Sequence, residues 1–232
     1  MTTLATIPSA LANTAESSHD ATSKTAKTSF RFPSIHSFPP FYTIQHNPVT
    51  RSQQLSQWRS LILDYCRHHR IFSLSPLPSI SDGATNHAAS DPHQFLFANK
   101  SIQRTLSPES IRQILTDLVD HKQGLWEDQL ITGKTIKTAS SSAGGGVANV
   151  YVYWKTPAQW ADTIYDWIIA TGQNKSIMTL FELNKGDLVV GQDFYDMPTP
   201  LLRSALKHLS SQGKAQIFAG SEANDGEGVK FV

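Results

Sequence analysis

The chain of 232 residues has a single cysteine, Cys66, and lacks any long apolar run. One cysteine cannot form a disulfide within the chain, and it cannot supply the several thiolates of a cysteine-based zinc site. We therefore expect a protein of a reducing compartment. A membrane-spanning helix needs about 18–20 consecutive apolar residues, and no stretch of the sequence approaches that length.

A surplus of positive charge is also missing. The sequence holds 20 lysines and arginines against 19 aspartates and glutamates, a formal net charge of +1, without a run of basic residues. Nucleic-acid binders usually carry a basic surplus, because neutralising phosphates supplies much of their affinity. The charge balance therefore disfavours a nucleic-acid partner.

The residue patterns that hold metals, cofactors or catalytic groups are lacking as well. His68 and His69 lie close to Cys66, but adjacent helix residues point about 100° apart, and no third ligand follows at a familiar spacing. The glycines at 144–146 are not followed by lysine and serine or threonine, so they do not form a phosphate-binding loop. We expect no enzymatic activity, no cofactor and no bound metal.

Two helices with one apolar face each are predicted in the first half of the chain. Thr50 is the expected N-cap of the first, whose apolar residues recur at three- and four-residue spacing. Ser107-Pro108-Glu109 is a helix-start signal for the second. The predicted apolar faces consist of Leu55, Trp58, Leu61, Ile62 and Tyr65, and of Ile111, Ile114, Leu115, Leu118 and Val119.

Loops and strands complete this half. Residues 75–94 are rich in proline, serine, aspartate and asparagine, which predicts an exposed loop. Leu125-Trp126 and residues 150–154 have the composition of strands. Between them, residues 132–149 form a flexible insertion rich in serine and glycine.

The same order of elements returns in the second half. Thr156-Pro157 starts a helix that Gly172 closes, a short helix follows over 179–183, and a third helix is stopped by Gly213. Residues 215–218 and 228–232 are predicted as paired strands around a polar turn at 220–227. The tryptophans Trp58, Trp154, Trp160 and Trp167 lie on apolar faces, so we expect them in the core rather than in a binding site.

Helices followed by a strand, a loop and a strand therefore occur in both halves, which is the plan of a winged-helix domain. The fold class expected is α+β, mainly α, with two tandem winged-helix domains preceded by an extended arm of prolines and aromatic residues. Residues 1–29, rich in serine, threonine and alanine, are expected to be a disordered tail. The remaining segments are the arm over 30–49, the first domain over 50–155 and the second over 156–232.

The arm is the strongest candidate for a binding site. Its centre is Phe38-Pro39-Pro40-Phe41-Tyr42, and the prolines favour an extended backbone. A segment that is already extended loses less conformational entropy on docking, and Phe41 and Tyr42 offer large apolar area. Taken alone, this pattern leaves two interpretations open, because the arm could equally fold back on its own domain. A ligand for WW-type domains is a remoter alternative.

Several of these residues, in this order, also occur in a known family. They are Phe38-Pro39-Pro40-Phe41-Tyr42-Thr43, Tyr65-Cys66-Arg67, Leu96-Phe97-Ala98-Asn99, Ile102-Gln103-Arg104, Tyr153-Trp154-Lys155, Ile164-Tyr165-Asp166-Trp167, Thr179-Leu180-Phe181-Glu182-Leu183 and Gly228-Val229-Lys230-Phe231. In sequence and spacing the chain from residue 30 onward resembles the vacuolar protein-sorting-associated protein 25 family, the small winged-helix subunit of ESCRT-II.

The resemblance implies a role in endosomal multivesicular-body sorting. Two copies of such a subunit would join two larger ESCRT-II subunits in a Y-shaped complex. The arm and the first winged helix would dock on a larger subunit, and the second winged helix would recruit the nucleating subunit of ESCRT-III. The protein would be cytoplasmic, recruited to endosomes, and in contact with the membrane only indirectly.

The resemblance also implies where the contacts lie. The larger subunits would contact Phe38, Pro39, Pro40, Phe41 and Tyr42, with Pro33 and Arg51 as weaker candidates. Around Pro33 the sequence departs from the family's proline-proline-X-tyrosine pattern, because it has one proline and no tyrosine. The ESCRT-III contact is expected between 172 and 187, with Thr179, Phe181 and Asp187 as candidates. Thr179 and Phe181 could equally belong to the core, and Arg51 and Arg104 could simply be solvated.

A tandem winged-helix protein that binds nucleic acid is the runner-up hypothesis. Helices that enter a DNA groove carry several basic side chains. The candidate helix over 108–121 has Arg112 but also three acids, and the one over 200–212 has only Arg203 and Lys207. A protein-binding adaptor therefore fits the sequence better.

Overall fold

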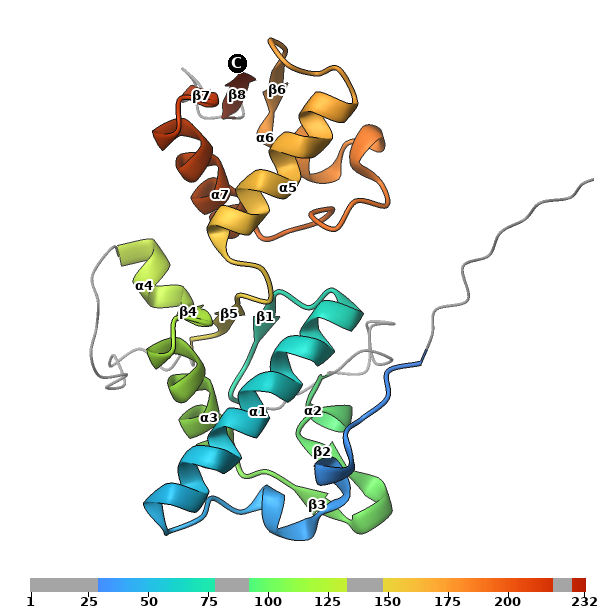
Figure 1. Ribbon diagram of the computed structural model, residues 1–232, viewed down its shortest axis with the longest axis vertical. Coiled ribbons are helices and arrows are strands. Elements are labelled where there is room, and N and C mark those ends of the chain that lie inside the picture. Colours follow the sequence, from blue (N-terminus) through green and yellow to red (C-terminus); the bar gives the residue numbers. More distant parts are fainter. Residues whose placement is uncertain (1–28, 78–91, 133–147, 219–226) are drawn as a thin grey trace, which may run out of the picture.

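The computed structural model describes residues 29–77, 92–132, 148–218 and 227–232. In Figure 1 these residues form two lobes that follow one another along the long axis, with the N-terminal arm beside the first lobe. Four predicted segments lie mostly outside the described residues. They are the tail at 1–29, the loop at 75–94, the insertion at 132–149 and the turn at 220–227. Among the helices that are described, none has the length and apolar character to cross a membrane.

The arm is less extended than the prolines suggested. Two short 3-10 helices form there, η1 over Ser34–Ser37 and η2 over Pro39–Tyr42. Proline lacks the amide hydrogen, but the first residues of a helical turn need no intrahelical donor, so Pro39 and Pro40 can begin η2. The expectation of a wholly extended arm was therefore wrong.

The long helix α1 spans Pro48–His69 and begins earlier than the sequence indicated. Its N-cap is Asn47 rather than Thr50, because the Asn47 side chain accepts hydrogen bonds from the amides of Val49 and Thr50. The helix ends at Arg70, which has left-handed backbone geometry with a φ of 55°. Of the predicted apolar face, Leu55 is half-buried, and Trp58, Leu61, Ile62 and Tyr65 are buried.

The other elements of the first lobe pack around α1. They are β1 (Ser73–Leu74), α2 (Pro92–Phe95), β2 (Ala98–Asn99), η4 (Lys100–Ile102), β3 (Arg104–Thr105), α3 (Pro108–Asp120), β4 (Gly124–Trp126), α4 (Glu127–Thr132) and β5 (Val150–Val152). Helix α3 starts as predicted, with the Ser107 hydroxyl accepting from the Ser110 amide. An ion pair between Arg59 and Asp117 joins α1 to α3.

Strand β5 is the centre of the first sheet, whose order is β1-β5-β4 with antiparallel pairing. Val150 faces both Leu74 of β1 and Trp126 of β4. The predicted strands at 125–126 and 150–154 are thus present, although the second ends at Val152. Strand β1, the β2–β3 hairpin and helix α4 were not predicted, because each is too short to show a periodicity.

The second lobe contains the predicted three helices and two strands. The elements are α5 (Pro157–Ala170), β6 (Ile177–Thr179), α6 (Leu180–Lys185), η5 (Asp187–Val189), α7 (Thr199–Ser211), β7 (Ala215–Phe218) and β8 (Gly228–Phe231). The sheet order is β6-β8-β7, so the unpredicted strand β6 adds a third strand beside β8. Helices α5 and α7 pack side by side. Their buried residues include Trp160, Ile164 and Ile168 of α5 and Leu202 and Leu206 of α7, and Tyr165 is half-buried.

The two lobes are tandem winged-helix domains, and their buried residues form one continuous cluster. All four tryptophans expected in the core are buried. Our proposed domain boundary at Lys155 falls between the end of β5 and the beginning of α5.

Substituting Thr156 with alanine should lower the free energy of unfolding by about 1 kcal/mol, because Thr156 and Gln159 form a capping box at the start of α5. The matched control is Thr116→Ala on the exposed side of α3, which should change it by less than about 0.5 kcal/mol. Urea unfolding followed by circular dichroism measures both. Equal values for the two variants would contradict the capping role.

Candidate protein interaction sites

The arm is anchored to the first domain by two buried aromatic side chains. Phe41 lies parallel to Trp58 with ring centroids 4.1 Å apart, and Tyr42 packs edge-on against the same indole. Phe41 is 3% and Tyr42 5% exposed. Neither side chain is therefore accessible to a partner in this conformation. The sequence left open whether the arm binds a partner or folds back on its own domain, and Phe41 and Tyr42 fold back.

Polar contacts hold the backbone of the arm in the same place. The side-chain nitrogen Nε2 of Gln54 donates to the carbonyls of Phe41 and Thr43, each at 2.9 Å. The Trp58 indole nitrogen donates to the Phe41 carbonyl at 3.1 Å. Arg51 is exposed, but its Nε donates to the Gln45 carbonyl at 2.7 Å. These donors satisfy carbonyls that the short 3-10 turns leave without partners.

His36 forms the other anchor of the arm and is 4% exposed. Its Nε2 lies 3.2 Å from the Leu96 carbonyl, which can only accept, so Nε2 carries the hydrogen. Nδ1 then accepts from the Asn99 side chain at 3.3 Å, and the His36 carbonyl accepts from Asn99 and from the Tyr42 hydroxyl. Burial lowers the pKa of His36 below its ordinary value of 6.5, although hydrogen bonds to the Leu96 and Phe95 carbonyls partly oppose this.

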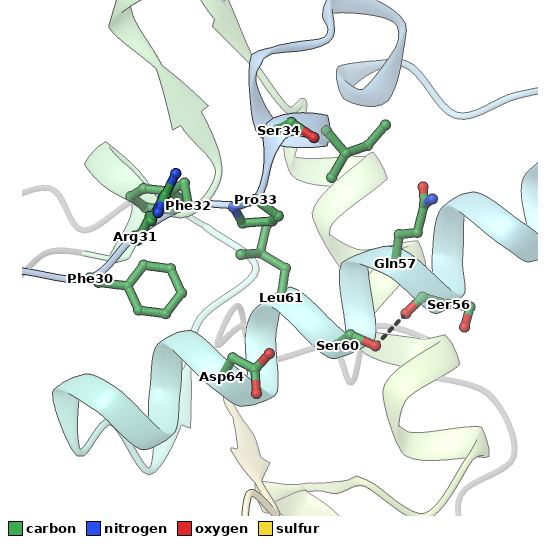
Figure 2. Close-up of a pocket in the computed structure, with 11 residues that line it drawn as sticks. Phe30, Arg31, Phe32, Pro33, Ser34, Ser56, Gln57, Ser60, Leu61 and Asp64 are labelled. Carbon is green, nitrogen blue, oxygen red and sulfur yellow. Dashed lines mark hydrogen bonds between the residues drawn. The ribbon is translucent and has the colours of Figure 1, made fainter.

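The exposed side of the arm borders a groove along α1. Figure 2 shows its wider part, where Leu61 points from α1 toward Pro33 and the Phe30 ring lies above the end of the helix. This part has a volume of about 810 Å³, and a smaller hollow of about 280 Å³ lies beside Phe38 and Pro40. Ile35 and Gln57 line both, so the two hollows are neighbours, and we call them together the arm groove.

The lining of the arm groove combines apolar and polar side chains. The smaller hollow has no charged residue in its lining, which consists of Ile35, Phe38, Pro40, Phe41, Gln45, Thr50, Gln53, Gln54 and Gln57. Phe38 is 52% exposed, and Pro33, Pro39 and Pro40 are exposed as well. Four of the residues selected from the sequence thus lie at the surface of the arm, whereas Phe41 and Tyr42 support them from below.

The candidate residues of the second domain differ in role. Thr179 is the N-cap of α6: its hydroxyl accepts from the Glu182 amide, and the Glu182 carboxylate accepts from the Thr179 amide. The hydrogen bond from the Thr179 amide has the largest effect on the pKa of the Glu182 carboxyl and lowers it, and the Thr179 side chain lowers it further. Phe181 is 69% exposed, and Asp187 is exposed at the start of η5. The sequence allowed either residue to belong to an interface or to the core. Phe181 lies at the surface, and Thr179 caps a helix.

More apolar residues are exposed in the same segment than the sequence suggested. Ile177, Leu188 and Val190 have exposed fractions of 68%, 65% and 60%. Helix α6, which carries Phe181, and η5, which carries Leu188, pack together. We call residues 177–190 the apolar segment. The run Leu188-Val189-Val190 outside any long helix was a signal that could have drawn attention to it, since only Val189 is buried.

Other chemistry-bearing groups found in the sequence have structural surroundings. Cys66 is fully buried, and burial raises the pKa of its thiol, so the unreactive protonated form is favoured. The described residues contain no group of three or more histidine, cysteine, aspartate or glutamate side chains that could hold a metal ion.

Comparisons with known proteins define the class of this chain. A family model described as "ESCRT-II complex subunit" matches residues 35–198. The human vacuolar protein-sorting-associated protein 25 is 34% identical over 203 residues, which cover 88% of this chain and 98% of the relative. The Xenopus laevis protein of that name is 32% identical over 202 residues, with 87% and 98% covered.

These matches make the chain a subunit of the ESCRT-II complex. Solved structures agree with this assignment. The structure of subunit VPS25 of ESCRT-II is similar with a TM-score of 0.63 and 29% identity, covering 86% of this chain and 98% of that one. A structure of ESCRT-II containing VPS22, VPS25 and VPS36 matches with a TM-score of 0.64 and 32% identity over the same shares. The chain therefore belongs to the vacuolar protein-sorting-associated protein 25 family, as its residues indicated. None of these relatives supports the nucleic-acid alternative.

Substituting Phe41 with alanine should lower the free energy of unfolding by about 3–5 kcal/mol, because it removes a buried ring and leaves a cavity against Trp58. Phe38→Ala is the matched control, since half of its ring is already exposed, and we expect a change below about 1 kcal/mol. Guanidinium unfolding monitored by tryptophan fluorescence compares the two. A large effect of Phe38→Ala would mean that the arm is held differently.

Lowering the pH should destabilise the chain through His36. The unfolded state takes up a proton near pH 6.5, while the folded state resists protonation because its pKa is lower. Stability is therefore full above about pH 6.5 and falls as the pH drops toward the folded-state pKa. The measurement is the free energy of unfolding between pH 7.5 and 5.5. His36→Gln should flatten this dependence, and His46→Gln, at an exposed position, should keep it.

Proposed function

We propose that this ESCRT-II subunit is a non-catalytic adaptor that connects the larger subunits of the complex to ESCRT-III. Its arm and first winged helix dock on a larger ESCRT-II subunit, with two copies of the chain in each complex. Its second winged helix recruits the nucleating subunit of ESCRT-III. The protein then acts in the cytoplasm, reaches endosomes through the complex and touches the membrane only indirectly.

The proposal that the arm docks on a larger subunit rests on the different burial of its residues. Phe41, Tyr42 and His36 are buried and fix the backbone, which keeps Phe38, Pro39 and Pro40 at the surface. An apolar group that is held rigid before binding loses little entropy on association. The uncharged lining beside Phe38 suits a partner surface that is also apolar, because no buried charge would be left unpaired.

The apolar segment of the second domain supports the recruitment half. Phe181, Ile177 and Leu188 each expose more than 60% of their surface on rigid elements rather than on loops alone. Large exposed apolar side chains that lie together are typical of interaction sites. The capping box at Thr179 fixes the start of α6 and so the direction of Phe181.

The docking test is co-expression of the chain with the two larger ESCRT-II subunits, followed by mass measurement of the purified complex. Wild type should yield two copies per complex. Phe38→Asp with Pro40→Ala should reduce or abolish incorporation, because a carboxylate in the uncharged hollow has no partner. The control is Phe218→Ala, a 40% exposed phenylalanine of the second domain.

Each outcome of the docking test has a defined meaning. Assembly of wild type and of Phe218→Ala with loss of the arm variant supports docking through the arm groove. If the arm variant, folded by circular dichroism, assembles as well as wild type, the arm is not the contact. Failure of wild type to assemble would refute the adaptor proposal itself.

Recruitment is tested by titrating the complex with the purified nucleating subunit of ESCRT-III. Phe181→Ala should weaken binding by about tenfold, the effect of removing an interface anchor worth about 1–2 kcal/mol. Ile169→Ala on α5, which is 49% exposed, is the control and should bind as wild type does. Unchanged binding by Phe181→Ala would place the contact outside the apolar segment. Thr179→Ser retains the hydroxyl cap and should also bind normally.

A further inference from the structure

The connection between the two domains is short and partly buried. Only residues 153–156 separate the end of β5 from the start of α5. Trp154 in this connection is 4% exposed, and Trp160 in the first turns of α5 is 1% exposed. Connections between independently moving domains are usually exposed and make few contacts across the boundary. This connection has the opposite character.

Three aromatic side chains meet at the junction. Phe72 of the first domain lies against Trp154 and Trp160, with ring centroids 5.4 and 6.0 Å away. The two indoles meet edge to face at 4.7 Å, and the Trp154 indole nitrogen donates to the Ile71 carbonyl at 3.0 Å. Separating the domains would expose this cluster to water, so the cluster favours the closed arrangement.

A polar network beside the cluster centres on Asp193 of the second domain. Its Oδ2 accepts from the Lys155 ammonium at 2.9 Å, and its Oδ1 lies 3.6 Å from the guanidinium of Arg70 at the end of α1. Arg70 also donates to the carbonyls of Gly191 and Gln192 at 3.4 Å. The Lys155 ammonium lies over the Trp160 ring, 4.8 Å from its centroid.

The two parts of the junction have different physical consequences. Apolar burial depends mainly on area and little on direction, so the aromatic cluster favours contact between the domains more strongly than any one angle between them. The Arg70–Asp193 pair is about half exposed, and such pairs add little to stability. The pair is directional, however, because the single Asp193 carboxylate must contact two cations at once. One is Arg70 on the first domain, and the other is Lys155 on the connection.

We propose that Asp193 is an orientation latch, which sets the angle between two domains that the Phe72, Trp154 and Trp160 cluster already holds together. The latch lies three residues after Val190, so it also ties the end of the apolar segment to the first domain. The arm groove and the apolar segment are then kept at a fixed separation and angle within one rigid body.

Distance measurements between spin labels on the full chain test the latch. Gln113→Cys on α3 and Lys207→Cys on α7 place one label on an exposed helix position of each domain. Cys66 is buried and can stay. The variant is Asp193→Asn, which removes the charge while keeping the shape. Asp196→Asn is the matched control, because Asp196 pairs with Lys185 at 3.0 Å within the second domain.

Wild type and Asp196→Asn should each give one narrow distance distribution. Asp193→Asn should give a broader distribution or a second distance, with an unchanged circular dichroism spectrum. A wild-type distribution already as broad as that of Asp193→Asn would show that the domains move independently. A narrow distribution in Asp193→Asn, equal to that of wild type, would show that the aromatic cluster alone fixes the angle. Either of these results would overturn the proposal.

Discussion

The stacking of Phe41 on Trp58 is the contact on which the arrangement of the arm depends. The indole is completely buried and contacts both Phe41 and Tyr42, while its nitrogen donates to the carbonyl of Phe41. Because the arm has only short 3-10 turns, it has few backbone hydrogen bonds of its own and needs such external contacts. The same contact determines which side of the arm faces outward.

The arm and the second domain use a common design, in which buried groups position exposed apolar ones. In the arm, His36 and Tyr42 are buried so that Phe38 and the prolines can remain at the surface. In the second domain, the capping box of Thr179 fixes α6, on which Phe181 is exposed. Exposed apolar side chains are costly in a monomer unless a partner covers them, and rigid presentation reduces the entropic cost of that partner's binding.

Much of the fold could be predicted from the sequence because the long helices have clear apolar periodicity. The helices at 108–120 and 157–170 were found with their N-caps, and the helix at 199–211 was found without one. The strands that contain Val150, Ile217 and Val229 were found as well. The start of α1 was missed by a few residues because Asn47 competes with Thr50 as a cap. Short elements such as β1, β6 and α4 could not be found, since two to six residues carry no period and form only when a neighbouring strand or helix is in place.

The candidate sites, like the fold, could be predicted from the sequence only in part. The order of proline and aromatic residues in the arm, the balanced charge and the repeated winged-helix pattern are properties of the sequence, and they indicated the fold class and the region of interest. The family was indicated by the resemblance of the ordered motifs from residue 30 onward. Which aromatic residue of the arm is buried was decided only by the tertiary structure, because Phe38 and Phe41 have the same side chain and differ only in what lies beneath them. The groove along α1, the exposure of Phe181 beside η5 and the meeting of Arg70 with Asp193 likewise join residues far apart in the chain or depend on local packing. Sequence spacing contains no information on such contacts until the chain has folded.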